Sequence, residues 1–329
     1  MVATPTREPE APASASDGPV TDLAARKPPL RRRIRRDWVL LALMLPGVGY
    51  FLVFHYGALF GNVIAFKDYV PFIGVWDSPW VGVENFTSLM GNTQFWHAAW
   101  NTVSIAGLQL LFYFPAPLAL ALLLHSLAGD TIRRFVQSVV YLPHFISWVI
   151  VVALFQQVLG DVGVLNGVLA DNGLTTIDII GNPDAYRPLV IAQIIWKECG
   201  WGTIIFLAAL TNVNEQLYEA AAIDGANAWR RFWHVTLPAI RPVVILLLIL
   251  RLGDILTVGF EQFFLQRNAV GPGAGEVLDT FVFYTGIGSG NFGTATAAGL
   301  MKGAIGLILV YSANKIAHRL GEQGVYKSR

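Results

Sequence analysis

Residues 218–264 read YEAAAIDGANAWRRFWHVTLPAIRPVVILLLILRLGDILTVGFEQFF, a polar, arginine-bearing loop followed by a long apolar run. The run near 239–264 exceeds the roughly 20 residues that a helix needs to cross about 30 Å of hydrocarbon. Five further segments meet this requirement, near 38–60, 100–125, 138–159, 188–211 and 293–317. None of them alternates polar and apolar residues as barrel strands do, and open strands would leave backbone groups unpaired in lipid. The sequence therefore predicts an all-α membrane protein with six transmembrane helices.

The composition of the whole chain agrees with lipid as its solvent. Of its 329 residues, 54% are hydrophobic and 14% are charged, and the mean hydropathy is +0.52. A soluble domain has about 25% charged residues, and a soluble protein of this length would need a charged surface that this chain does not have. The single cysteine, Cys199, excludes an intrachain disulfide and a metal site built from cysteines.

The distribution of lysine and arginine predicts how the chain crosses the membrane. Positive charges gather in four regions, which are the tail before Trp38 and the stretches near 126–137, 212–238 and 315–329. The intervening loops, near 61–99, 160–187 and 265–292, hold only Lys67, Arg187 and Arg267. Because positively charged loops stay in the cytoplasm, we expect both termini on the cytoplasmic side of a bacterial inner or plasma membrane.

These features divide the chain into three parts. Residues 1–36 have little apolar content and are expected to be a disordered, basic cytoplasmic tail. Residues 37–320 form the transmembrane domain, and 321–329 form a second cytoplasmic tail. The outer loop between the first two spans is rich in tryptophan, which favours the membrane–water boundary, with contact to an external partner near 79–86 as the alternative.

The cytoplasmic loop 212–238 has the pattern of a helix-turn-helix. Residues 219–223 predict a short helix closed by Gly225, since glycine readily takes the left-handed conformation that ends a helix. A second helix is expected to begin at Asn227, which suits an N-cap, and to be broken at Pro238. Such a motif suits docking in a groove on another protein, while an amphipathic segment on the membrane surface is the alternative.

This loop resembles the EAA loop of ABC importer permeases. The family pattern is Glu-Ala-Ala, three residues, Gly, nine residues, Ile, one residue, Leu-Pro. It is met here, with valine in place of isoleucine, by Glu219, Ala220, Ala221, Gly225, Val235, Leu237 and Pro238. The resemblance extends from about residue 38 to 320 and is closest to the carbohydrate-uptake branch of the oligosaccharide type. Stretches such as SPWVGVENF (78–86) and WKECGWGTIIFLAAL (196–210) look like that branch.

The resemblance implies a type I ABC importer permease fold and a transport subunit rather than an enzyme. It implies that the loop seats in a cleft of a separate ATPase. The coupling residues implied are Glu219, Ala220, Ala221, Asp224, Gly225, Ala226, Leu237 and Pro238.

The same resemblance implies a set of partners. They are a second, homologous permease, by family habit a different chain, two ATP-binding cassette ATPase subunits, an extracytoplasmic solute-binding protein and the lipid bilayer, with no nucleic acid. ATP and Mg are expected on the ATPases. No cofactor or metal is expected on this chain, whose sequence has no Gly-x4-Gly-Lys-Ser/Thr phosphate loop.

Polar side chains inside the apolar runs are candidates for a translocation pathway, because such groups in a bilayer usually face a cavity or a partner helix. The candidate pathway residues are Asn101, Gln109, Gln193, Trp196, Glu198, Trp201, Asp254, Glu261 and Gln262. Sugar sites combine aromatic faces with amides and carboxylates, so Trp196 and Trp201 beside Gln193 and Glu198 form the sharpest cluster. Gln156, Lys197 and Lys302 are further polar residues in these runs, and Lys302 could instead pair with an acid on a neighbouring helix.

Two other functions stay open at this point. The EAA-like motif does not name the cargo, so a permease for amino acids, peptides or another small solute is an alternative. A membrane-embedded hydrolase or transferase could use His97, His144 or Asp161 as acid-base groups, although no spaced nucleophile or metal motif accompanies them.

Overall fold

The computed structural model describes residues 37–127 and 129–319, so the predicted tails 1–36 and 321–329 lie outside the described residues. In this part the chain is built of helices, and the one extended pairing is an isolated bridge between Lys67 and Trp80. Six helical stretches in it are long and apolar enough to cross a membrane. They are Trp38–Phe66, Thr93–Ser126, Trp148–Asp171, Pro183–Thr211, Ala228–Gly253 and Phe292–Ile316. The prediction of an all-α protein with six membrane-spanning candidates is confirmed.

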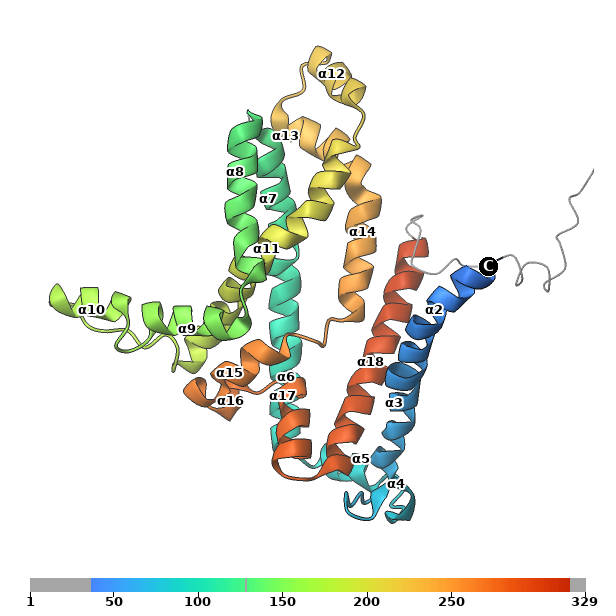
Figure 1. The fold of residues 1–329 in the computed structure, drawn as a ribbon. Coiled ribbons are helices and arrows are strands. Elements are labelled where there is room, and N and C mark those ends of the chain that lie inside the picture. The colour runs from blue at the N-terminus through green and yellow to red at the C-terminus, as the bar shows by residue number, and fades with distance from the viewer. Residues whose placement is uncertain (1–36, 128, 320–329) are drawn as a thin grey trace, which may run out of the picture. The chain divides into compact units, whose positions relative to one another are not determined.

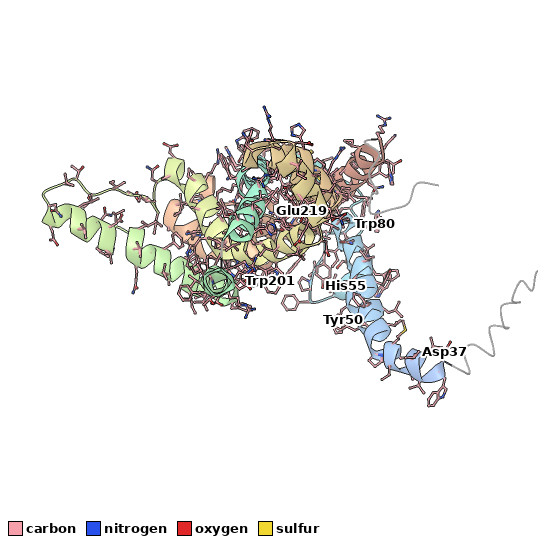
Figure 2. The ribbon with its side chains drawn as sticks, turned by 90° about the horizontal axis from the view of Figure 1, so that it is seen from above. Asp37, Tyr50, His55, Trp80, Trp201 and Glu219 are labelled. Carbon is pink, nitrogen blue, oxygen red and sulfur yellow. The ribbon has the colours of Figure 1, made fainter. Side chains whose placement is uncertain are left out.

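Internal contacts divide the chain into two units, residues 1–60 and 61–329. The described part of the first unit is one helical rod, made of α2 (Trp38–Phe51), the π-helical turn η1 (Leu52–Tyr56) and α3 (Gly57–Phe60). No side chain of these three elements is buried, so the rod does not cover its own apolar surface. On this rod the rings of Tyr50 and His55, both marked in Figure 2, meet edge to face.

The second unit is a bundle arranged around α11 (Pro183–Thr211). The elements α6 (Thr93–Leu108), η3 (Gln109–Tyr113) and α7 (Pro115–Ser126) form one long path, and α8 (Asp130–Tyr141) returns beside α7 (Figure 1). α11 packs against α7 and α14 (Leu237–Gly253). The core between these helices consists of Ala121, Phe206, Leu210 and Ile240.

The predicted third span, 138–159, is wrong as a single helix. The chain breaks at the 3-10 turn η4 (Leu142–Phe145), because Pro143 cannot donate a backbone hydrogen bond there. Ser147 then caps a new helix, α9 (Trp148–Leu159), which is followed by α10 (Val164–Asp171). Figure 1 shows α9 and α10 running across the direction of α7 and α8.

The predicted fifth span, 239–264, is wrong at both ends. α13 (Ala228–Arg231), the π-helical turn η5 (Phe232–Thr236) and α14 follow one another without a break, so Pro238 does not end the helix. The helix instead ends at Gly253, and the chain is irregular until α15 (Phe260–Val270). Gly259 in this irregular segment has a φ of +119°, which a side chain with a Cβ rarely adopts.

The remaining elements gather at the end of the bundle opposite α12 (Glu215–Ile223) and α13 (Figure 1). They are η2 (Gly61–Phe66), α4 (Gly74–Asp77), α5 (Glu84–Met90), α16 (Pro272–Gly275), α17 (Leu278–Phe283) and η6 (Tyr284–Gly288). α18 (Phe292–Arg319) starts among them and runs back along α14. The second unit therefore has two distinct ends, and each carries a different set of loops.

Candidate functional site

The first helix of the 212–238 loop is closed by the glycine that its sequence predicts. α12 ends where the N–H of Gly225 donates to the oxygen of Ala222 at 3.1 Å and the N–H of Ala226 donates to that of Ala221 at 2.9 Å. These two bonds define a Schellman closure, and the φ of +72° at Gly225 is the left-handed value that the closure requires. The prediction for Gly225 is confirmed.

The second helix of the loop is continuous with the following span. Asn227 caps it as predicted, since its Oδ1 accepts a hydrogen bond from the N–H of Arg230 at 2.9 Å. The helix then passes through η5 into α14. The hydroxyl groups of Tyr218 and Thr236 lie 3.0 Å apart and join the first helix of the loop to η5. The loop and α14 are therefore one connected body.

The surface of this loop is open to another protein. Of the predicted coupling residues, Glu219, Ala220, Asp224, Gly225 and Pro238 are exposed, whereas Ala221, Ala226 and Leu237 are half-buried. Figure 2 looks onto this end of the chain, where Glu219 is marked. Two large apolar side chains are also uncovered, because Ile223 is 87% exposed and Trp229 is 67% exposed. A groove of about 930 Å³ lies between α7 and the loop, lined by residues that include Leu122, Tyr218, Trp229 and Phe232.

Two predicted pathway residues, Gln193 and Gln262, are buried in a cluster of three glutamines. Gln193 and Gln266 exchange reciprocal amide hydrogen bonds at 3.0 and 2.9 Å, and Gln262 Nε2 donates to Gln193 Oε1 at 2.8 Å. None of the three side chains is more than 1% exposed. They join α11 to α15, and their amide nitrogens bond to each other's oxygens and to the backbone carbonyls of Val190 and Gln262, while Gln262 Oε1 accepts no hydrogen bond within the described residues.

Asn101, another candidate, lies in a second buried network. Its Nδ2 donates to the carbonyl oxygens of Gly273 and Glu276 at 2.8 and 3.0 Å, and its Oδ1 accepts from Arg187 at 3.1 Å. The carboxylate of Glu276 is 1% exposed and accepts from Arg267 at 3.0 Å. A buried carboxylate of this kind is stable only with such partners. The network holds the segment after α15 against α6.

Gln109 joins the two sides of the irregular segment that follows α14. Its Nε2 donates to the carbonyl oxygen of Val258 at 3.0 Å, and its Oε1 accepts from Arg251. The guanidinium of Arg251 also lies 5.5 Å from the ring centre of Tyr113. Arg251 was not among the pathway residues predicted from the sequence, although an arginine inside an apolar run itself indicates a functional position.

The irregular segment 254–259 lies beside two cavities. One, of about 270 Å³, is lined by residues that include Tyr113, Gly202, Arg251 and Asp254. The other, of about 580 Å³, is lined by Thr257 and by the rings of Phe260 and Phe283 among others. Irregular backbone at membrane depth is tolerated where it lines a cavity or is buried in protein. Two predicted pathway residues are exposed here. Asp254 lies in this segment, and Glu261 lies at the start of α15.

Glu198 and Trp201 belong to a cluster between α11 and η4. Glu198 accepts from His144 Nδ1 at 2.7 Å and lies 3.1 Å from the ammonium of Lys197, which also donates to the carbonyl oxygen of His144 at 2.8 Å. The imidazole of His144 stacks on the indole of Trp201 at 4.5 Å between ring centres. Trp201 is 48% exposed and precedes Gly202, which lines the smaller cavity.

The other polar residues singled out from the sequence are placed as follows. Trp196 meets Phe155 of α9 edge to face, so the predicted cluster of Trp196, Trp201, Gln193 and Glu198 is divided over different faces of α11. Lys302 forms an ion pair with Asp279 of α17, which confirms the alternative that this lysine pairs with an acid on a neighbouring helix. Gln156 is exposed on α9.

Known proteins similar to this chain agree with these observations. Residues 113–320 match the family described as binding-protein-dependent transport system inner membrane component. The chain is 44% identical over 318 residues to the polygalacturonan/rhamnogalacturonan transport system permease protein YteP of Bacillus subtilis, a match that covers 96% of this chain and 99% of that protein. It is 45% identical over 294 residues to Protein LplB of the same organism, covering 89% and 92%.

A solved structure shares the fold as well. The crystal structure of a bacterial alginate ABC transporter, in complex with an alginate pentasaccharide-bound periplasmic protein, contains a chain that is 38% identical to this one. The two superpose with a TM-score of 0.82 over 90% of this chain and 99% of that one. The type I permease fold is therefore confirmed, and the membrane-embedded enzyme that would use His97, His144 or Asp161 is not supported. The chain belongs to the family of inner membrane components of binding-protein-dependent transport systems.

Proposed function

We propose that this chain is the permease subunit of an ABC importer that carries oligosaccharides. The observation that carries the proposal is the 212–238 loop, whose exposed helix-turn-helix continues into α14 without a break. The choice of cargo is supported by the relatives, of which one is named for polygalacturonan and rhamnogalacturonan and another was solved with alginate. No relative reported above is named for amino acids or peptides, so the oligosaccharide is favoured over that alternative.

The proposed coupling follows from mechanical continuity. A separate ATPase would hold α12 through exposed side chains such as Glu219 and Ile223, both of which are free to contact another chain. Closure of two ATPases on ATP and Mg would move this loop. Because the loop is bonded to η5 and η5 continues into α14, the same displacement reaches the irregular segment at 254–259. The free energy of nucleotide binding would thereby change the conformation of the translocation pathway.

The proposed pathway passes the irregular segment 254–259. Asp254 offers a carboxylate and Arg251 a guanidinium to the same cavity, and these groups can bond to sugar hydroxyls. Trp201, which precedes Gly202 of the cavity wall, offers a half-exposed ring that can cover sugar C–H faces. Four buried amides would not contact the cargo and would instead fix the positions of the helices that carry these groups. They are those of Asn101, Gln109, Gln193 and Gln262. Trp196, Glu198 and Glu261 remain candidates for direct contact.

The proposed assembly contains a second, homologous permease, two ATPases and an extracytoplasmic binding protein. The 212–238 loop and both termini would face the cytoplasm, as the lysine and arginine distribution predicts. The opposite end of the bundle would then face outward.

The proposal is tested with the chain reconstituted in proteoliposomes together with its partner subunits. Uptake of radiolabelled oligosaccharides that needs both ATP and a binding protein is the expected result. Uptake of amino acids with no response to any saccharide would contradict the proposed cargo. The coupling role would be contradicted if the 212–238 loop reacted with a crosslinker confined to the extracytoplasmic side, or if it never crosslinked to an ATPase.

A further inference from the structure

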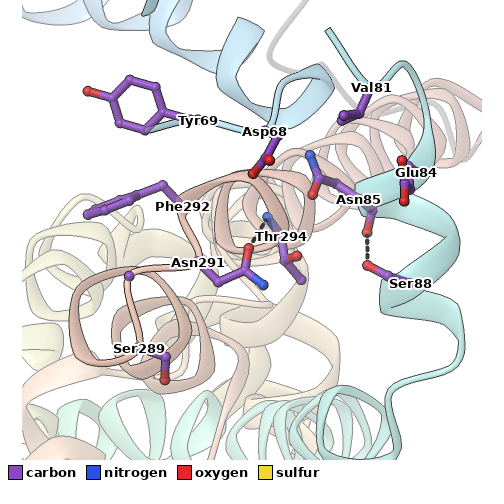
Figure 3. A pocket seen from close by; sticks show the side chains of 11 residues that line it. Asp68, Tyr69, Val81, Glu84, Asn85, Ser88, Ser289, Asn291, Phe292 and Thr294 are labelled. Atoms are coloured by element: carbon purple, nitrogen blue, oxygen red, sulfur yellow. Dashed lines mark hydrogen bonds between the residues drawn. The ribbon is translucent and has the colours of Figure 1, made fainter. Parts of the chain in front are cut away.

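A polar pocket of about 500 Å³ opens at the end of the bundle opposite the 212–238 loop. Three segments build it, namely residues 68–69 after η2, residues 81–88 at and before the start of α5, and residues 289–294 at the start of α18. Figure 3 shows Asp68 and Asn291 directed into the opening, with Glu84 and Ser88 along one side and the rings of Tyr69 and Phe292 on the other. Nothing in the coupling or pathway described above uses this pocket.

The walls of the pocket are fixed before any ligand binds. Asn85 Nδ2 donates to the carbonyl oxygens of Ala65 and Lys67 at 2.9 and 3.0 Å, which ties α5 to the end of η2. Gly293 packs so closely on this joint that an added Cβ would lie 2.6 Å from Asn85 Nδ2. The three segments are thus held together by close contacts, and little ordering would be required when a partner binds.

The pocket carries negative charge that the described part of the chain does not neutralise. Asp68 and Glu84 are both exposed, and neither has a lysine, arginine or histidine nitrogen within 4 Å among the described residues. The neighbouring cation, Lys67, is 9% exposed and turned away. Its ammonium donates to the carbonyl oxygens of Val75, Trp76 and Ser78 at 2.6, 3.1 and 3.3 Å.

We infer that this pocket receives a basic side chain, an arginine or lysine, from the docking face of the extracytoplasmic solute-binding protein. The inference rests on the proposed function, which places this end of the bundle outside. A cationic side chain complements the two free carboxylates, and the amide and hydroxyl groups of Asn291 and Ser88 can accept its remaining hydrogen bonds. A metal ion fits less well, since the described residues contain no group of three or more histidine, cysteine or acidic side chains that could hold one.

The test uses the complete importer in lipid nanodiscs and the solute-binding protein that stimulates its ATP hydrolysis. The double variant Asp68→Asn with Glu84→Gln keeps the shape of the pocket and removes its charge. We expect the Kd for the binding protein to rise about tenfold, mainly through slower association, and the salt dependence of association to weaken. Asp77→Asn is the matched control, because Asp77 is an exposed carboxylate of the same outer region that does not line the pocket, and it is expected to leave the Kd unchanged.

The outcomes separate this inference from the proposed function. If the wild-type importer responds to no binding protein, both fail. If it responds and the double variant binds with the wild-type Kd, only the pocket inference fails. A raised KM for the saccharide at unchanged Kd for the binding protein would make the pocket a sugar subsite, and a loss of calorimetric Ca²⁺ binding would make it a cation site; either result overturns the inference. Recovery of affinity when Asp68→Lys is paired with a basic-to-acidic change on the binding protein would confirm it.

Discussion

The substitution Gly225→Val tests whether the closure of α12 transmits ATP hydrolysis to transport. An added Cβ at Gly225 meets no atom within 4 Å, so the substitution causes no clash and acts on the backbone alone. A left-handed φ of +72° costs a branched residue about 1–2 kcal/mol. If the chain instead leaves that conformation, it gives up the two bonds of Gly225 and Ala226, worth about 1 kcal/mol each. Either route lowers the equilibrium constant between the closed and the open turn roughly 5- to 30-fold.

The assay is sugar uptake per ATP hydrolysed in proteoliposomes that contain the complete importer. We expect this ratio to fall, by at most that factor, while membrane insertion and subunit assembly are unchanged. Gly173→Val is the matched control, because Gly173 has a φ of +69°, has no neighbour within 4 Å of an added Cβ, and lies outside the 212–238 loop. Wild-type uptake per ATP in Gly225→Val, or an equal loss in both variants, would refute the reasoning.

Three further substitutions have specific expected outcomes. Gln193→Leu removes the oxygen that accepts from Gln262 and Gln266 and the donor to Gln266 Oε1, which is left unsatisfied at about 1–3 kcal/mol, so thermal unfolding in detergent should begin at a lower temperature. Glu261→Gln on the exposed face should not shift it. Trp201→Ala removes a half-exposed ring and should raise the KM for saccharide uptake several-fold with normal assembly, and an unchanged KM would place this ring off the pathway. Thr236→Val removes the hydroxyl that meets Tyr218, at about 1 kcal/mol, and should lower uptake per ATP less than Gly225→Val does; no change would show that this contact carries no displacement.

Local signals were sufficient to predict the turn between the two helices of the 212–238 loop. Gly225 and Asn227 act within their own turn of chain, since a glycine closes a helix and an asparagine caps one with groups that are a few residues away. Hydropathy likewise predicted six spans, because length and apolar content are properties of single segments.

The interior of the bundle could not be read in the same way. Gln193 and Gln262 are amides in apolar runs, and the sequence does not show that they bond to each other and that Gln266 exchanges two further hydrogen bonds with Gln193. His144 illustrates the same difficulty, because its partner Glu198 is 54 residues away in sequence. A polar residue in a span signals that a partner exists, and only the packing of helices decides whether that partner is protein or cargo.

The error at Pro238 has a physical explanation that bears on coupling. A proline inside an α-helix removes one hydrogen bond and crowds the carbonyl four residues earlier. In this chain the π-helical turn η5 ends at Thr236, two residues before Pro238, and the N–H of Leu237 bonds to the carbonyl oxygen of Phe232, five residues back. The same arrangement occurs at Pro115, which follows η3 and the bond from the N–H of Phe114 to Gln109 at 2.9 Å. In both places the widened turn accommodates the proline, and the helix continues.

Under the proposed coupling, this continuity would decide how a displacement of α12 by an ATPase is transmitted. A helix broken at Pro238 would connect the loop to α14 through a flexible joint, and a displacement of the loop would be lost in that joint. A π-helical turn retains backbone hydrogen bonds on both sides, and the Tyr218 hydroxyl bonds to Thr236 within it. Under the proposed coupling the loop and α14 would move as one lever, and the first place where that lever could bend is the irregular segment after Gly253, where Asp254 and Arg251 line a cavity.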